Sequence, residues 1–184
     1  MCHAKIFLTH SDIITIIVSM KKIIFLFLTL IVVSGICFAA DPVEGYWISF
    51  DEKTGKATAG WQIYLEGNKL YGKILSFSDK SKGLLASQCK DSYPDFPVAG
   101  KVSQMPVAGT TWIYGLSSTK TGEWSGGSIV NPEDGKHYKC KIFFRPADGK
   151  KYQTDTLEMR GEIGLGIGRS QFWKKSDLQA ASAL

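Results

Sequence analysis

The chain has 184 residues, a length that suits one domain and leaves little room for two. Its formal charge of +5 comes from 22 basic and 17 acidic residues, and no dense cluster of lysine and arginine appears among them. A small and scattered excess of this kind excludes a nucleic-acid-binding stripe.

The first forty residues differ from the rest of the chain. Met20-Lys21-Lys22 is followed by IIFLFLTLIVVSGICFAA, an apolar run typical of secretory signals that ends in small residues. We therefore expect residues 20–39 to be a signal peptide cleaved near Ala39, which would export the protein to the periplasm or the extracellular space. An uncleaved membrane anchor is the alternative, because about eighteen apolar residues can just span a bilayer. Residues 1–19 fit neither a signal nor a fold, and we interpret them as an extension before the natural start at Met20.

Residues 40–184 are predicted to form a single domain. They number 145, enough to bury one sizeable core, and carry 19 basic and 16 acidic residues, a formal charge of +3. Two of the four cysteines, Cys89 and Cys140, lie in this part. In an oxidising compartment an even pair predicts a disulfide. The alternative is a buried free thiol at Cys140.

Helical periodicity is nearly absent after residue 41. Short stretches rich in aromatic and β-branched residues alternate instead with Gly, Asn and Asp, which is the signal for antiparallel strands joined by tight turns. The expected strands are residues 45–50, 57–65, 69–77, 110–116, 123–130, 136–144, 152–160 and 169–175. About eight strands in sequential hairpins predict an all-β, antiparallel up-and-down barrel or a sandwich.

One long connection interrupts this series. Residues 78–109 contain no confident strand, although KGLLASQCK (82–90) is compatible with a short helix. A connection of this length in a compact domain is usually functional, for example as a lid, or has structure of its own. Since Cys89 lies in it, the predicted disulfide would tie this loop to the strand that holds Cys140.

The stretch NPEDGKHYKCKIFF (131–144) raises the question of a catalytic site. Residues 131–135 have the composition of a turn, and Asp134-Gly135 supplies the positive φ that tight hairpins need. In the strand that follows, alternation places Cys140 on the apolar face and His137 on the opposite face with the lysines. A Cys–His pair is excluded by that geometry, and we interpret Asp134 and Gly135 as structural.

The remaining residues give little support for an enzyme. His137 is the one histidine after residue 39, so no multi-histidine metal site can be built, and no cofactor is expected. Paired carboxylates remain formally possible among Glu133, Asp134, Asp155 and Glu158. The glycine-rich segments do not open a helix after a strand, as a phosphate-binding loop requires.

Several segments together resemble a bacterial family of small secreted proteins called domain of unknown function 2147. The segments are EGYWISFD, LYGKIL, GEWSGGSIVNPEDGKHYKCKIFF, LEMRGEIGLGIGRSQFWKK and VAGKVSQMPVAGTTWIYGL, of which the third is the most distinctive. The resemblance implies a lipocalin-like or calycin-like barrel and assigns no biochemical activity. Many members carry cysteines near the LYGKI hairpin, where this chain has Tyr71, so the resemblance supports no disulfide here.

A feature of the first strand points to the same architecture. Gly45-Tyr46-Trp47 matches the Gly-x-Trp that opens calycin barrels, and Arg169 on the last strand is expected to lie over the indole and close that end. A tryptophan in the core of a plain β-sandwich is the alternative.

Three functions are compatible with these residues. The first is a non-catalytic binding module for a small amphiphilic or apolar ligand, in a cup with aromatic walls and a cationic anchor; its candidate residues are Trp61, Trp112, Trp124, Tyr138 and Arg160. Ordinary core packing explains the same aromatic residues without a ligand. The second is a structural or interaction protein of the cell envelope, and the third, least favoured, is a carboxylate-dependent hydrolase.

Overall fold

The protein was analysed as a computed structural model that describes residues 40–78 and 85–184. The predicted signal peptide, the extension before it and residues 79–84 of the long loop lie outside the described residues. The strands are β1 (Gly45–Phe50), β2 (Ala57–Glu66), β3 (Lys69–Phe77), β4 (Thr111–Lys120), β5 (Glu123–Val130), β6 (His137–Arg145), β7 (Thr156–Gly164) and β8 (Ile167–Ser176). They are followed by the short helix α2 (Leu178–Ser182).

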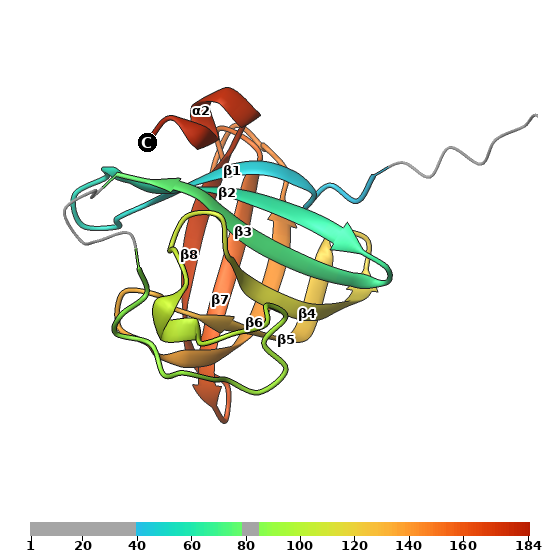
Figure 1. The fold of residues 1–184 in the computed structure, drawn as a ribbon. Coiled ribbons are helices and arrows are strands. Elements are labelled where there is room, and N and C mark those ends of the chain that lie inside the picture. The colour runs from blue at the N-terminus through green and yellow to red at the C-terminus, as the bar shows by residue number, and fades with distance from the viewer. Residues whose placement is uncertain (1–39, 79–84) are drawn as a thin grey trace, which may run out of the picture. The chain divides into compact units, whose positions relative to one another are not determined.

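The eight strands form a closed antiparallel barrel in which each strand pairs with its neighbours in sequence (Figure 1). β8 closes the barrel by pairing with β1, with Trp47 opposite Lys175. This confirms the predicted up-and-down architecture. No helix of the described part of the chain is long and apolar enough to cross a membrane.

The strand at residues 152–160 was predicted four residues too early. The structure instead has a loop there, because the Asp148 carboxylate accepts hydrogen bonds from the backbone N–H groups of Lys150 and Tyr152. β7 begins only at Thr156 and continues through the glycine-rich segment to Gly164. Residues 161–168, which were left outside the expected strands, therefore form the outer part of the β7–β8 hairpin.

One end of the barrel is closed by a packed core around Trp47. The indole N–H of Trp47 donates to the Val43 carbonyl at 2.9 Å, and its ring meets Phe144 edge-on at 6.4 Å. Deeper in the barrel, Trp61 stacks on Trp173 with ring centroids 4.6 Å apart. Contacts of this kind bury large apolar areas, so this half of the barrel is filled by side chains.

The cation over Trp47 is Lys175, and the predicted stacking of Arg169 is wrong. The Lys175 ammonium lies 4.4 Å from the Trp47 ring centroid and donates to the Glu44 carbonyl at 2.7 Å. Gly45 leaves room for it, because a Cβ at that position would lie 3.0 Å from the Lys175 nitrogen. Arg169 lies six residues earlier on β8, at the other end of the barrel, where it pairs with Glu52.

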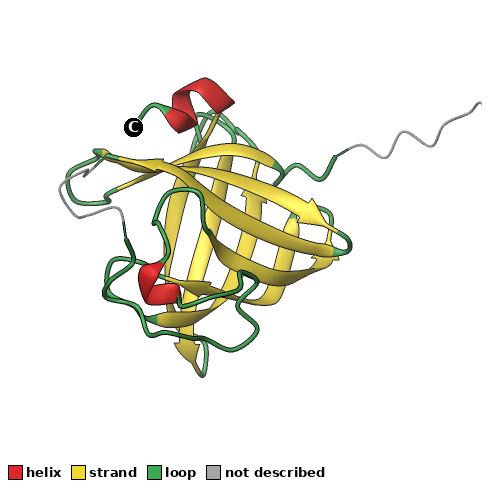
Figure 2. Cartoon of the chain, viewed as in Figure 1, coloured by secondary structure: helices red, strands yellow, loops and turns green. Residues whose placement is uncertain are grey.

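The described part of the long loop packs on the outside of the barrel. Phe96 contacts Trp112 and Tyr114 of β4, and Tyr93 lies 6.0 Å from the His137 ring of β6. Figure 2 shows the single helical turn of this segment, which is the 3₁₀ turn η2 (Val102–Gln104). A helix over 82–90 was predicted, but residues 85–90 form a bridge and a turn, and residues 82–84 lie outside the described residues.

The predicted disulfide does not form, since both Cys89 and Cys140 are free and buried. Cys89 lies against the turn before β6, because a Cβ added to Gly135 of that turn would lie 3.0 Å from the Cys89 Cα. Cys140 lies five residues further along, and a strand rises about 3.3 Å per residue. A disulfide requires Cα atoms within about 7 Å of each other, so the two thiols are too far apart.

Candidate functional site

The end of the barrel opposite Trp47 is hollow. A cavity of about 970 Å³ opens between the β1–β2 turn, the β5–β6 turn and the β7–β8 hairpin. Ligand cavities in proteins usually measure about 300–1,000 Å³, so this space is large enough for one small molecule.

The floor of the cavity is apolar. It consists of inward-facing side chains from five strands, namely Trp61, Ile74, Ile129, Tyr138 and Met159. Four of these side chains are buried against the core, and Tyr138 is half-buried. A floor of this composition favours a hydrocarbon or aromatic group over a polar one, because its atoms offer dispersion contacts and few hydrogen bonds.

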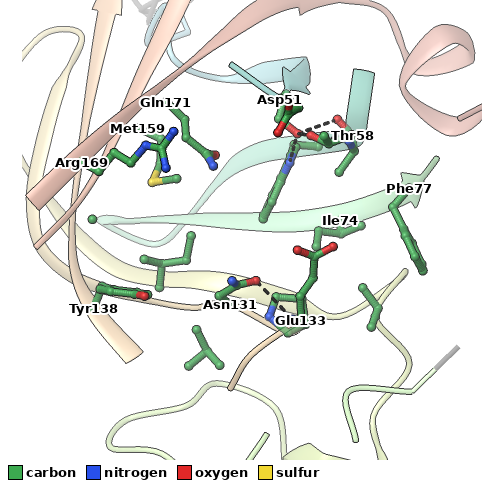
Figure 3. Close-up of a pocket in the computed structure, with 18 of the residues that line it drawn as sticks. Asp51, Thr58, Ile74, Phe77, Asn131, Glu133, Tyr138, Met159, Arg169 and Gln171 are labelled. Atoms are coloured by element: carbon green, nitrogen blue, oxygen red, sulfur yellow. Dashed lines mark hydrogen bonds between the residues drawn. The ribbon is translucent and has the colours of Figure 1, made fainter. Parts of the chain in front are cut away.

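Polar and charged groups surround the mouth. Figure 3 shows Arg169 and Gln171 of β8 across the cavity from Asn131 and Glu133 of the β5–β6 turn. Asp51 and Glu52, from the β1–β2 turn, complete this part of the rim. The combination of an apolar floor and a polar rim is suited to a molecule with one apolar and one polar end.

The charges of the rim are partly committed to each other. Arg169 donates to the Glu52 carboxylate at 2.6 Å, an exposed ion pair that bridges the β8 and β1 sides of the mouth. The Asp51 carboxylate accepts hydrogen bonds from the hydroxyl and the backbone N–H of Thr54, and these bonds lower the Asp51 pKa. Asp51 therefore shapes its own turn while remaining ionised at neutral pH.

A hydrogen-bond network supports the wall beside Trp61. The Ser49 hydroxyl lies 2.7 Å from the Thr58 hydroxyl and accepts the Trp61 indole N–H at 3.2 Å. Because the polar edge of Trp61 is satisfied by the protein, its ring face is left to line the cavity. The network holds the orientation of this ring.

Only some of the sequence-predicted ligand residues meet here. Trp61 and Tyr138 line the cavity. Trp124 points into the barrel, as its pairing with the buried Ile142 shows, but it does not line the cavity, and its buried indole N–H has no hydrogen-bond partner among the described residues.

Trp112 and Arg160 do not belong to the cavity. Trp112 alternates with the inward-facing Ile113, so it faces outward and is buried under Phe96 of the loop. Arg160 also faces outward, and its guanidinium donates to Glu162 and to the Gly166 carbonyl, both at 2.9 Å. The arginine that lines the cavity is Arg169, which was expected to lie over Trp47.

The sequence analysis missed much of the β7–β8 contribution. The cavity-lining residues there are Met159, Gly161, Ile163, Ile167, Arg169 and Gln171. Their signal was present as alternation on both sides of the glycine-rich segment, but residues 161–168 were left outside the expected strands. Positions 161 and 163 were therefore never assigned to a strand face.

The β5–β6 turn has the expected local structure. Gly135 has φ of +66°, and the Asp134 carboxylate accepts the backbone N–H of Lys136 at 3.0 Å. The long loop crosses directly above this turn, because a Cβ on Gly135 would overlap the Gln88 carbonyl oxygen. The loop residues Leu85, Ser87, Gln88 and Val107 form one side of the cavity.

Three of the four candidate carboxylates have separate partners. Asp134 pairs with Lys136 in the β5–β6 turn, whereas Glu158 pairs with Arg145 on the outer face of β7. Asp155 accepts the backbone N–H of Ala147 before β7. Within residues 40–78 and 85–184, no group of three or more His, Cys, Asp and Glu side chains is placed to hold a metal ion.

Comparison with known proteins agrees with this architecture. No curated protein matches the chain. Protein HP1028 from the human pathogen Helicobacter pylori, whose solved structure is described as belonging to the lipocalin family, is similar with a TM-score of 0.57 and 16% sequence identity. The match covers 74% of this chain and 84% of that chain, and at this identity it shows the fold alone. The model of a family described as "uncharacterized protein conserved in bacteria (DUF2147)" matches residues 45–175, and the chain belongs to that family.

Proposed function

We propose that this protein is an exported, non-catalytic binding module that holds one small amphiphilic or apolar molecule in the open half of its barrel. The observation that carries the proposal is the cavity of about 970 Å³ with an apolar floor and a polar rim. A barrel of eight strands has an interior that side chains either fill or leave open for one small ligand. In this barrel, side chains fill the interior of the closed half, and the interior of the other half is open.

The charge and chemistry of the cavity favour binding over catalysis. Its rim supplies carboxylates, an arginine and amides, while His137 faces the outer wall against Tyr93 and Tyr114. Burial raises the pKa of the Cys140 thiol far above the ordinary value, which disfavours the thiolate that a nucleophilic cysteine needs. Export is supported by the lysine-led apolar run at residues 20–39.

The test is a titration with 1-N-phenylnaphthylamine, an apolar probe whose fluorescence rises outside water. We expect saturable binding of one probe per chain, and displacement by alcohols or acids with a dodecyl chain. Met159→Trp fills the floor and should weaken binding by about tenfold or more. Phe172→Trp places the same bulk on the exposed outer face of β8 and serves as the matched control.

Thermal unfolding of each variant confirms that the barrel is intact. Saturable binding that Met159→Trp weakens and Phe172→Trp leaves unchanged supports the cavity as the site. Absence of saturable binding by the wild-type protein, or equal binding by all three proteins, would overturn the proposal.

A further inference from the structure

The β7–β8 hairpin has the most exposed large apolar side chains of the described residues. Ile163, Leu165 and Ile167 expose 72%, 102% and 62% of their surface. Figure 1 shows the tip of this hairpin projecting from the barrel at the end opposite α2. Single exposed leucines are common, but three large apolar side chains within five residues at a projecting tip form an exposed apolar patch.

The tip has a fixed conformation that presents Leu165 to the outside. Leu165 has φ of +49°, a conformation that is costly for a residue other than glycine, and it lies between Gly164 and Gly166. The Arg160 guanidinium donates to the Gly166 carbonyl at 2.9 Å and fixes the turn from its base. An apolar side chain held at a strained position points to a role outside folding.

The apolar tip is continuous with the cavity. Ile163 and Ile167 line the mouth of the cavity as well as flanking the tip, and Met159 and Gly161 carry the same face of β7 down to the floor. A hydrocarbon chain leaving the floor therefore follows apolar side chains to the end of the hairpin. The tip marks the direction from which such a chain would enter.

Cations surround the base of the hairpin. Lys141 and Arg160 both contact Glu162, with Lys139 opposite Glu162 in the strand pairing, and Arg169 contacts Glu52. On the outer face of β6 and β7, three cations (Lys139, Lys141 and Arg160) against the Glu162 carboxylate leave this collar with a net charge of +2. Arg169 and Glu52 cancel each other, and the rim of the mouth also carries Asp51 and Glu133. An apolar tip above a cationic collar complements a bilayer with anionic lipid, which offers a hydrocarbon interior below a negative surface.

We propose that the tip formed by Ile163, Leu165 and Ile167 inserts into the outer layer of an anionic lipid bilayer. The cationic collar then meets the head groups, and the mouth of the cavity faces the membrane. An amphiphile exchanges between bilayer and barrel without crossing water, a step that rests on the proposed function. The contact is peripheral, because only the tip of one hairpin enters the lipid.

The test measures co-sedimentation of the exported protein with vesicles of equal parts phosphatidylglycerol and phosphatidylcholine. Leu165→Asn removes the apolar side chain and suits the backbone, since asparagine tolerates positive φ. It should weaken binding by about tenfold, the effect of removing one inserted leucine. Leu178→Asn makes the same change at an exposed leucine on α2 and should bind as the wild type does. Vesicles of phosphatidylcholine alone should bind all three proteins more weakly.

A second measurement follows the fluorescence of a tryptophan placed at the tip. It detects insertion of the tip even if another segment of the chain also contacts the vesicle. In Leu165→Trp the added indole should shift to shorter emission wavelength on anionic vesicles and be quenched by brominated acyl chains, whereas the added indole of Phe172→Trp should show neither effect. Leu165 does not line the cavity, so Leu165→Asn should leave phenylnaphthylamine binding intact. Equal vesicle binding by Leu165→Asn and the wild type, or an added indole in Leu165→Trp that stays unquenched, would overturn the proposal. So would cross-linking of the tip to an envelope protein without any vesicle binding.

Discussion

At the scale of single residues, the closed end of the barrel depends on one lysine. Lys175 covers Trp47 and donates to the Glu44 carbonyl, and burial lowers its pKa below the ordinary lysine value. Lysine fulfils this role without the planar stacking that arginine offers, because the space above Gly45 admits a compact ammonium. The Gly-x-Trp pattern located the tryptophan correctly, but nothing in the sequence distinguished Lys175 from Arg169 as its partner.

Replacement of these two cations should therefore have different effects on stability. Lys175→Met loses a cation–π contact and a hydrogen bond, and should lower the free energy of unfolding by about 1–2 kcal/mol. Arg169→Met loses only an exposed ion pair and should lower the free energy of unfolding by less than about 1 kcal/mol. Urea unfolding followed by tryptophan fluorescence measures both. A larger loss for Arg169→Met than for Lys175→Met would return the capping role to Arg169.

At the scale of elements, the long loop is attached to the barrel at two places. Gln88 crosses the β5–β6 turn at Gly135, and the Tyr93 hydroxyl donates to the Gly135 carbonyl at 2.7 Å. Further along, Phe96 packs on Trp112 and Tyr114. The described part of the loop is therefore a fixed strap over the outer wall that also contributes one side of the cavity.

The first attachment is tested by a pair of glycine substitutions. Gly149→Ala introduces alanine at φ of +67° in open space and should cost about 1 kcal/mol of stability. Gly135→Ala introduces it at φ of +66° against the Gln88 carbonyl and should cost about 2–3 kcal/mol. Chemical denaturation gives both values. Equal losses would show that the loop moves away from the turn at no cost.

The contact between Tyr93 of the loop and His137 of β6 should respond to acid. Burial, with the nearby charge of Lys90, lowers the pKa of His137 below its ordinary value. The folded protein therefore favours the neutral ring, and the unfolded chain binds the proton first as the pH falls below about 6.5. The stabilising contribution is complete above that pH and is lost as the pH falls toward the lowered pKa.

The measurement compares unfolding free energies at about pH 7.5 and 5.5. The wild type should lose stability over this interval, by well under 1 kcal/mol because the ring is partly exposed. The His137→Gln variant should lose less stability over this interval, because His137 is the histidine of the barrel that titrates in this range. An identical pH dependence in both proteins would assign the acid response to other groups.

The strands were predictable from the sequence because each is a short alternating run with turn residues at both ends. The same rule failed where glycine interrupts the alternation, between residues 161 and 168, and where Asp148 competes for backbone N–H groups before β7. Partners of individual side chains were less predictable. The face that Trp112 occupies depends on register irregularities between β3 and β4, which the local sequence does not encode. Arg160 alternates with the buried Met159, so its outward face follows from the strand period once β7 is placed.

At the scale of the whole molecule, the barrel is divided into a filled half and a hollow half. Trp47, Trp173 and Leu157 fill the closed half, while the open half contains the cavity, whose mouth carries polar, charged and exposed apolar side chains. The division explains how a small domain can be stable and still contain a cavity of about 970 Å³. The β7–β8 hairpin extends the hollow half outward and gives it an apolar approach.

The central claim is that this cavity holds a ligand in the cell. The most direct test is a native mass spectrum of the protein purified without detergent from the cells that produce it. We expect the bare chain and a second species heavier by one small amphiphile, with the second species reduced in Met159→Trp and retained in Phe172→Trp. A spectrum of the bare chain alone, from protein that also fails to bind phenylnaphthylamine, would contradict the claim.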